Sequence, residues 1–425
     1  MSLTRREWLK STVGTPALLA LTPIVPSIFS RAARAAAAAA AQDQRDNVLV
    51  LLQLSGGNDG LNTVVPYADD HYGRSRTTLR LAENELHKLD ASLGFHSEFA
   101  AVWKLYQEGR ASVIQGVGYP HGNRDHDAAL RDWHTARPGD DACQTGWVGR
   151  TIDLAASRGD PTVPGMFVGP IDKPFVLQAE QQIVPAIRAL DAGQLQGLER
   201  LRIQGQRWHE LGGPAAGGGS SPENAANPLL DLAVRNQQAA YADGAQLEAV
   251  LRQADRSADY PPFQLASHLA AVVQLIRARL GIRIFVVELG GGGIGGFDNH
   301  ANQRDNHAAL LRQMSLSLAA FVNDLQRSGL LDRVILLTFS EFGRTLAENG
   351  RRGTDHGEAA PVFLFGGRLR GGLVGAHPRL DQLVGEAPAT HTDVRRVYAT
   401  VLDRWLGLDS AAVLGQAYEP LDVFA

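Results

Sequence analysis

The amino-acid sequence predicts an α/β protein whose central, mostly parallel sheet lies between helices. Five apolar runs have the length and composition of buried strands, and amphipathic helices separate several of them. These runs cover residues 48–54, 111–116, 282–289, 334–339 and 361–366. Loops with Asp or His follow four of the runs, as expected where ligands bind beyond the carboxyl ends of parallel strands.

The composition is that of an ordinary globular protein and excludes several classes. The chain has 425 residues, of which 44% are apolar and 20% charged, so it can form one large domain or two smaller ones. A net charge of −4 without a dense basic patch gives no reason to expect nucleic acid as a partner. Cys143 is the single cysteine, which excludes an internal disulfide and a zinc site made of several thiolates.

Residues 1–41 are predicted to be a twin-arginine signal peptide. Arg5 and Arg6 precede an apolar stretch, 15–29, and an alanine-rich run, 32–41, that offers cleavage sites. Prolines and arginines interrupt the segment, which argues against a permanent membrane span. We therefore expect export by the twin-arginine machinery, with the mature protein, from residue 42, periplasmic or secreted.

The first predicted strand, 48–54, runs into a turn that contains Asp59. An Asx-turn is the structural alternative for this residue, because Asn-Asp-Gly is turn chemistry in itself. A helix over 95–105 precedes the strand at 111–116. The exit loop of that strand leads to Asp125 and His126, and a helix is expected from 128 to 135.

The segment from about 150 to 280 is predicted to hold a helical cap inserted into the domain that spans 42–425. Helical patterns cover 191–210, 229–253 and 263–280, and short strands are expected at 162–170 and 175–177. No chemical motif stands out in this segment.

The strand at 282–289 leads to a glycine-rich loop, 290–296, and then to Asp298 and His300. These glycines match a dinucleotide-binding pattern formally, but no helix opens on them, so nucleotide binding is not predicted. A helix over 303–328, with His307 at the head of its apolar face, connects to the strand at 334–339. This order predicts a right-handed crossover between two parallel strands.

The strand at 334–339 ends at Glu341, and its exit loop brings Asp355 and His356. His391 precedes a closing helix, 394–406. Carboxylates and imidazoles without thiolates suit zinc, manganese, iron or magnesium, and their number is sufficient for two ions. Each residue alone could be a turn former, a helix cap or a surface group. Their recurrence after every strong strand favours a metal site.

Four blocks of sequence resemble an exported bacterial family, domain of unknown function 1501, of the alkaline phosphatase-like and sulfatase-like superfamily. The blocks are LSGGNDGLN (54–62), GFDNH (296–300) with Gln303, SEFGR (340–344) and GTDHG (353–357). The resemblance implies a sheet between helices and a site for two divalent metal ions. The ligands that it implies are Asp59, Asp298, His300, Asp355, His356 and His391.

One position departs from the superfamily, whose hydrolases place a Ser, Thr or modified Cys nucleophile after the second strand. This chain has Asp125 and His126 there, with no Ser or Thr between Ser112 and Thr135. The expectation is therefore attack by metal-bound water, with Asp125 as a ligand or base. His126, Glu341 and Arg344 are expected to support the ligands or to stabilise an oxyanion.

These observations predict an exported, metal-dependent hydrolase of phosphate or sulfate esters, or of a related polar small molecule. The predicted catalytic residues are Asp125, His126, Glu341 and Arg344. The alternative is a periplasmic binding or assembly protein that uses the same scaffold and binds metal without catalysis. The absent Ser favours this alternative, while the many candidate ligands favour metal binding in either case.

Overall fold

The computed structural model describes residues 47–158, 165–182, 184, 186–188, 259–291 and 296–425. The predicted signal peptide lies outside the described residues. The same holds for the predicted helices 191–210 and 229–253.

The central sheet is mostly parallel, as the sequence predicts. Within the described residues it has nine strands, and β1 (Val48–Leu54) lies near its middle, between β9 (Val334–Phe339) and β8 (Ile284–Leu289). All three are parallel, and β6 (Gly165–Gly169) and β7 (Ala186–Arg188) continue the parallel order beyond β8.

The other half of the sheet contains one reversed strand. β10 (Ala360–Gly366) is antiparallel both to β9 and to β5 (Ala111–Gly118), so β5 runs in the same direction as β9. β11 (Gly372–Val374) and β14 (Thr392–Asp393) pair with β5 in parallel. The four strands that Asp- and His-containing loops follow therefore all end at the same edge of the sheet.

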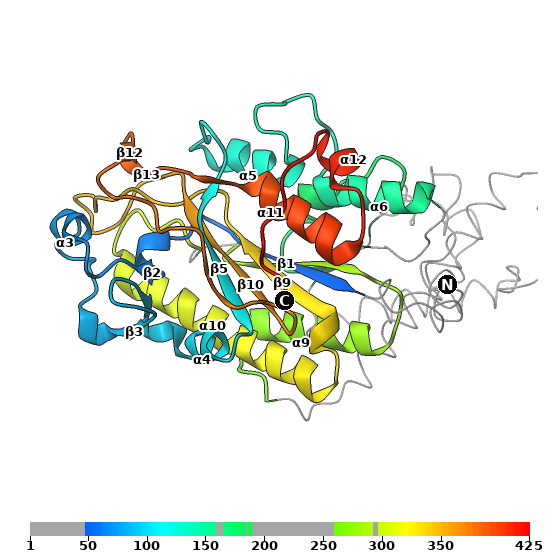
Figure 1. Ribbon diagram of the computed structural model, residues 1–425, viewed down its shortest axis with the longest axis horizontal. Helices are drawn as coiled ribbons and strands as arrows, with labels where there is room; N and C mark the ends of the chain where they lie inside the picture. The colour runs from blue at the N-terminus through cyan, green and yellow to red at the C-terminus, as the bar shows by residue number, and fades with distance from the viewer. Residues whose placement is uncertain (1–46, 159–164, 183, 185, 189–258, 292–295) are drawn as a thin grey trace, which may run out of the picture.

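Helices cover both faces of this sheet (Figure 1). One face is covered by α4 (Ala100–Gln107), α9 (Gln264–Arg277) and α10 (Gln303–Arg327). The opposite face is covered by α5 (His126–Thr135), α6 (Trp147–Ser157), α11 (Val394–Ala399) and α12 (Ser410–Leu414), and a π-helical stretch, Thr400–Leu406, continues α11.

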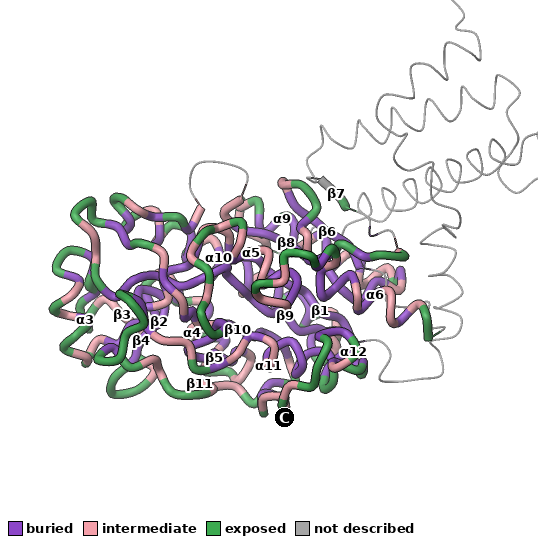
Figure 2. The backbone as a smooth tube through the Cα atoms, turned by 90° about the horizontal axis from the view of Figure 1, so that it is seen from above, coloured by how far each residue is buried: buried purple, intermediate pink, exposed green. Residues whose placement is uncertain are grey.

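Each layer has its own apolar core because alternate side chains of a strand point to opposite faces. Val50 and Leu52 of β1 belong to the core under α9 and α10, whereas Leu49 and Leu51 belong to the core under α5 and α11. The tube in Figure 2 is accordingly buried along the strands and exposed at the loops of the rim.

Short elements surround the carboxyl ends of the strands. β2 (Val64–Val65), β3 (Leu86–Lys88) and β4 (Gly94–His96) form a small antiparallel sheet, next to α3 (Asp70–Ser75). β12 (Leu383–Val384) and β13 (Ala387–Pro388) form a two-stranded ribbon.

The segment predicted to hold a cap contributes to the main layers wherever it is described. β6 and β7 are strands of the central sheet, and α9 packs against α10. The expected short strand at 175–177 is wrong, because Phe175–Leu177 forms a 3-10 turn after Pro174. Among the described residues, no helix is both long and apolar enough to cross a membrane.

Replacement of Leu52 by Ala is expected to lower the free energy of unfolding by about 3 kcal/mol, since it leaves a cavity in the central strand. Leu52 is fully buried, whereas Leu316 on α10 is 37% exposed and provides the matched control. Urea denaturation of both variants tests this. A Leu316→Ala loss as large as that of Leu52→Ala would contradict the described core.

Candidate metal centre

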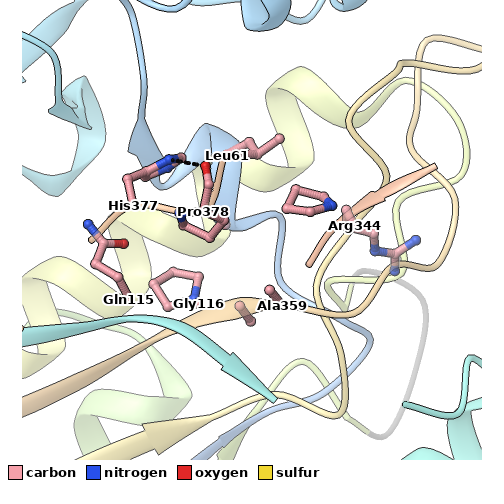
Figure 3. A pocket seen from close by; sticks show the side chains of 11 residues that line it. Leu61, Gln115, Gly116, Arg344, Ala359, His377 and Pro378 are labelled. Carbon is pink, nitrogen blue, oxygen red and sulfur yellow. Dashed lines mark hydrogen bonds between the residues drawn. The ribbon is translucent and has the colours of Figure 1, made fainter. Parts of the chain in front are cut away.

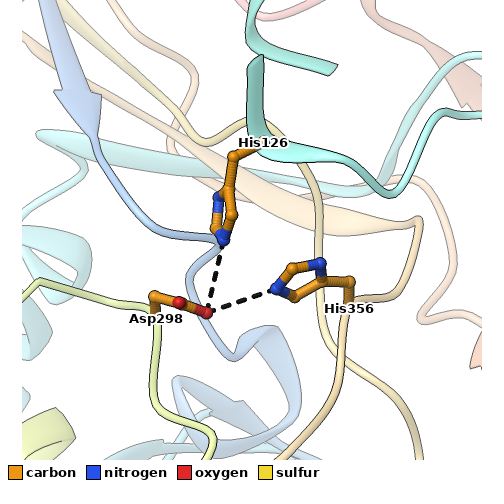
Figure 4. Close-up of side chains that lie close together, drawn as sticks. All are labelled: His126, Asp298 and His356. Atoms are coloured by element: carbon orange, nitrogen blue, oxygen red, sulfur yellow. Dashed lines mark hydrogen bonds and ion pairs between the residues drawn. The ribbon is translucent and has the colours of Figure 1, made fainter. Parts of the chain in front are cut away.

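His126, Asp298 and His356 converge at the carboxyl edge of the sheet (Figure 4). They come from the first residue of α5, the loop after β8 and the loop after β9. Nε2 of His126 and Nε2 of His356 lie 3.4 and 3.3 Å from Oδ1 of Asp298. Nε2 of His300 lies 3.0 Å from the same oxygen. Three imidazoles thus surround one carboxylate oxygen.

The Nδ1 atom of each imidazole is already occupied by an acceptor. His126 Nδ1 contacts Glu341 Oε1 at 3.0 Å, and His300 Nδ1 contacts Asp355 Oδ1 at 2.9 Å. His356 Nδ1 lies 2.6 Å from the main-chain oxygen of Arg124.

Carbonyl and carboxylate oxygens only accept hydrogen bonds, so each Nδ1 carries the proton. In the neutral rings the Nε2 lone pairs are therefore free, and all of them point toward Asp298.

The contact between His300 Nε2 and His356 Nε2, 2.8 Å, needs a positive charge between the two atoms. Two neutral rings that are both protonated at Nδ1 would face each other with lone pairs, which repel. A shared proton or a metal ion removes this conflict. Ligand atoms at about 2.0–2.1 Å from a tetrahedral zinc ion lie roughly 3.3 Å apart, close to the separations found here. The donor set therefore fits a divalent ion.

The surroundings favour the ligand forms of two of these groups, Asp298 and His356. Burial opposes ionisation of Asp298, but the hydrogen bond and charge of Arg344 hold its pKa below the usual value. Burial lowers the pKa of His356, which keeps that ring neutral. By contrast, the hydrogen bond that His126 donates to Glu341 raises the pKa of His126, which favours the protonated form of that ring. Asp298 is 44% exposed and His126 35%, so the cluster is open to a small molecule.

Arg344 is a buried side chain that holds the loops of the cluster together through hydrogen bonds. It is 2% exposed, and all three of its nitrogens donate to acceptors on the surrounding loops. These acceptors are the main-chain oxygens of Gly56, Gly57, Phe297 and Thr354 and Oδ1 of Asp298. The guanidinium therefore holds the loops together and orients Asp298, and its predicted oxyanion role stays a prediction.

Gly56 makes the close approach of these loops possible. Its φ is +111°, a conformation that favours glycine, and a Cβ at this position would overlap the main chain of Phe297 and Asp298. Its N–H donates to Glu341 Oε1 at 2.7 Å, the same oxygen that contacts His126. Glu341 therefore links β1, β9 and α5 at the site.

Asp59, predicted as a metal ligand, lies elsewhere in a buried ion pair. It is 2% exposed, and both of its oxygens accept hydrogen bonds from Arg76, at 2.6 and 2.9 Å. Gln303 donates to Oδ2 as well. Burial disfavours the charged form, but Arg76 lowers the pKa of Asp59 overall. The Asp59 carboxylate is thus already satisfied by protein donors.

Two further predicted residues are not brought to the cluster. Asp125 is exposed, and its carboxylate caps α5 by accepting from the N–H of Ala128 at 3.1 Å. His391 packs against β5, where a Cβ on Gly116 would overlap its ring. Asp355 lies at the site, but its carboxylate contacts Nδ1 of His300, not the Nε2 atom that faces Asp298. It orients that ring and accepts a hydrogen bond from Asn349 at 3.0 Å.

A small pocket near His377 is not a substrate site. Gln115, Gly116, Arg344 and Pro378 are among its lining residues (Figure 3). Its volume of about 20 Å³ suffices for a single water molecule.

Sequence reasoning assigned His126 a supporting role, whereas the structure places it among the potential ligands. The available signal was its position directly after Asp125, a good N-cap, which sets His126 at the first turn of a helix that begins at the sheet edge. The main-chain oxygen of Arg124 orients His356, and a main-chain contact of this kind could not be predicted from residue types.

The fold and the site together define an α/β protein with an imidazole–carboxylate cluster at the carboxyl ends of its parallel strands. The chain belongs to the family described as protein of unknown function DUF1501, which it matches over residues 111–418. This confirms the predicted family. No curated protein matches the chain.

Several solved structures are similar to this chain at low sequence identity. The lipoteichoic acid synthase LtaP from Listeria monocytogenes is 9% identical with a TM-score of 0.40, and the match covers 87% of this chain and 76% of that one. The PsFucS1 sulfatase from Pseudoalteromonas sp. is 12% identical, with 94% and 75% covered and a TM-score of 0.38. A protein of the alkaline phosphatase superfamily from Vibrio parahaemolyticus is 11% identical, with 88% and 70% covered and a TM-score of 0.36.

Replacement of Asp59 by Asn is expected to lower the free energy of unfolding at pH 7 by about 3 kcal/mol, because the charge of the buried Arg76 loses its partner. The native pKa of Asp59 is below its unfolded value, so the ionised form stabilises the fold above about pH 4. That contribution is lost as the pH falls through the native pKa.

Urea denaturation of wild type and Asp59→Asn between pH 3 and pH 7 measures this effect. The difference between the two proteins should shrink as the pH falls. Metal content should not change, and loss of a bound ion in the folded variant would show that Asp59 is a ligand after all.

Proposed function

We propose that this protein is a metal-dependent hydrolase of phosphate or sulfate esters, or of a related polar substrate. The residues that would hold the ion are His126, Asp298, His300 and His356. The observation that carries the proposal is the convergence of three Nε2 lone pairs on the Asp298 carboxylate, while each Nδ1 is committed to an oxygen. Such oriented imidazoles are typical of metal ligands.

We propose one ion at this site, where the sequence predicted two. Among the described residues, ligand-type side chains whose donor atoms all lie close together form a single group, His126, Asp298 and His356, and His300 lies beside it. The Asp59 carboxylate accepts hydrogen bonds from Arg76 and Gln303, and the His391 ring packs against β5. Nitrogen-rich donors with a carboxylate favour zinc over magnesium or calcium, which prefer oxygen ligands.

A divalent ion at this position would act as a Lewis acid toward a substrate oxygen and would activate water. The protein's own groups supply orientation and charge. Phe342 stacks on His356, with ring centroids 4.5 Å apart, and forms an apolar wall beside the ligands. Arg351 and Arg352 are exposed on the loop before Asp355, and the charge of Arg351 reaches Asp355. This local positive charge supports an anionic ester as substrate.

We also propose that the protein acts outside the cytoplasm, as a periplasmic or secreted protein. The support is the twin-arginine motif and the apolar segment that follows it.

The purified protein is expected to bind about one divalent ion per chain, because one group of oriented ligands is present. Elemental analysis by mass spectrometry measures this directly. His356→Ala should lose the ion while retaining a native circular dichroism spectrum. His71→Ala, which changes an exposed histidine on α3, should keep it.

Glu341→Gln provides a finer test of the same site. It should weaken metal binding about 10- to 100-fold, since the carboxylate that orients His126 is lost. A wild type that binds no ion even after incubation with zinc, manganese or iron would contradict the metal centre.

The metal-loaded protein is expected to hydrolyse p-nitrophenyl phosphate or p-nitrophenyl sulfate, and removal of the ion by a chelator should abolish turnover. Release of p-nitrophenol is the measurement, and re-addition of the ion should restore it. A protein that holds its ion but turns over neither ester, nor a wider panel of phosphate and sulfate esters, would favour the binding or assembly role.

A further inference from the structure

The Ser and Thr hydroxyl groups around the metal centre differ in their hydrogen-bond acceptors. Thr345 donates to the main-chain oxygen of Ala347 at 3.0 Å, and Thr354 donates to the Gln303 amide at 2.6 Å. Ser340 is buried and donates to the main-chain oxygen of Leu54 at 2.7 Å, with Glu341 farther away at 3.3 Å. These hydroxyls hold the loops together. Ser55 is different, because it is half-buried and its partner is a buried carboxylate, Glu288.

A directed chain of hydrogen bonds fixes the proton of Ser55. His134 is buried and its pKa is lowered to about 3 by burial, so the ring is neutral and its Nε2 donates to Gln53 Oε1 at 2.9 Å. The amide of Gln53 then donates from Nε2 to Ser55 Oγ at 2.9 Å. Since this amide occupies an acceptor site of Ser55 Oγ, the hydroxyl proton is directed to another acceptor.

Glu288 is the acceptor at the end of this chain. It is 3% exposed and lies directly opposite Gln53 in the pairing of β1 with β8, so it points to the same face as Gln53 and Ser55. Its carboxylate accepts from the N–H of Gly291 and from Ser55. Burial raises the pKa of Glu288, and the nearby charge of Glu341 adds to this effect. A carboxylate whose pKa is raised accepts a proton more readily than a free carboxylate does.

The main chain of Ser55 is part of the metal centre's framework. The N–H of Phe297, the residue before Asp298, donates to the Ser55 oxygen at 3.0 Å. The N–H of Gly56, the next residue along the chain, donates to the Glu341 oxygen that contacts His126. The main chain at Ser55 and Gly56 is therefore bonded to the residue before Asp298 and to the carboxylate that contacts His126.

We propose that Ser55 is the nucleophile of this site and that Glu288 receives its proton. In the first step Ser55 Oγ forms a bond to the phosphorus or sulfur of the ester, and the bond to the leaving alcohol breaks. The proton passes from Ser55 to Glu288 and on to that alcohol. In the second step water attacks the modified serine, gives a proton to Glu288 and releases the acid, while Ser55 recovers its proton. The side-chain amide N–H of Gln53 stabilises charge on Oγ.

This inference rests on the proposed function, and it supplies a nucleophile that the sequence does not place after β5. It replaces direct attack by water with a covalent route. The reaction needs no co-reactant beyond the ester and water, and no role is assigned to Asp125.

A fluorophosphonate probe tests Ser55 without any need to know the natural substrate. Attack by Oγ forms the bond to phosphorus, fluoride leaves, and the proton goes to Glu288. The metal-loaded wild type should carry one adduct, found by mass spectrometry on the peptide that contains Ser55. Ser55→Ala should lose the adduct, and Glu288→Gln, which keeps the size of the side chain, should slow labelling at least tenfold.

Ser157→Ala is the matched control, because its exposed hydroxyl donates only to a main-chain oxygen, that of Leu154. It should be labelled at the wild-type rate. Circular dichroism establishes that each variant is folded. A folded wild type that remains unlabelled at Ser55, or a Glu288→Gln variant labelled as fast as wild type, would overturn the proposal.

Measurement of ester hydrolysis distinguishes failure of the Ser55 nucleophile from failure of the proposed hydrolase function. Ester hydrolysis that persists in Ser55→Ala overturns the nucleophile and leaves the hydrolase intact. Labelling of Ser55 without turnover of any ester in the panel supports the nucleophile and contradicts the proposed ester hydrolysis.

Discussion

The buried guanidinium of Arg344 is the interaction on which the arrangement at the sheet edge depends. It donates to main-chain oxygens after β1, β8 and β9 and to the carboxylate of Asp298. Loops that lead away from different strands have no common secondary structure to align them, and their buried carbonyls need donors. One planar group with five N–H bonds meets both needs, and its charge also keeps Asp298 ionised. Arg344 thereby fixes the positions of these loops and of Asp298 at the proposed metal centre.

The sequence predicts the strands well because buried parallel strands are continuous apolar runs, and β1 and β9 begin and end where their runs do. It predicts the edge of the sheet at which Asp298, His300 and His356 gather for the same reason. It could not predict the sheet order, since the reversed strand β10 between β9 and β5 has an apolar run like the others. Strand order depends on pairings between distant residues, which a periodicity does not contain.

The positions of Asp59 and His391 away from the cluster have specific causes. Asp59 has the local sequence of a functional turn, but its partner Arg76 occurs in a segment without any motif, and the pairing exists only in the folded chain. His391 follows the pattern of a ligand before a helix, yet the missing side chain of Gly116 lets it rest on β5. Conversely, Glu288 reads as part of an apolar strand in sequence, and its contact with Ser55 appears only once β1 and β8 are paired.

The position of β5 has a consequence for how an ion would bind at the proposed metal centre. β10 separates β5 from β9, so the chain that leaves β5 must return over β10 to bring His126 to Glu341, a residue 215 positions away in sequence. The donor atoms therefore meet only after pairings of high contact order have formed, and such pairings form slowly. An unfolded or half-folded chain offers no preassembled site. An ion that binds only the completed sheet adds its binding free energy to the folded state, which makes thermal stability a function of free metal concentration.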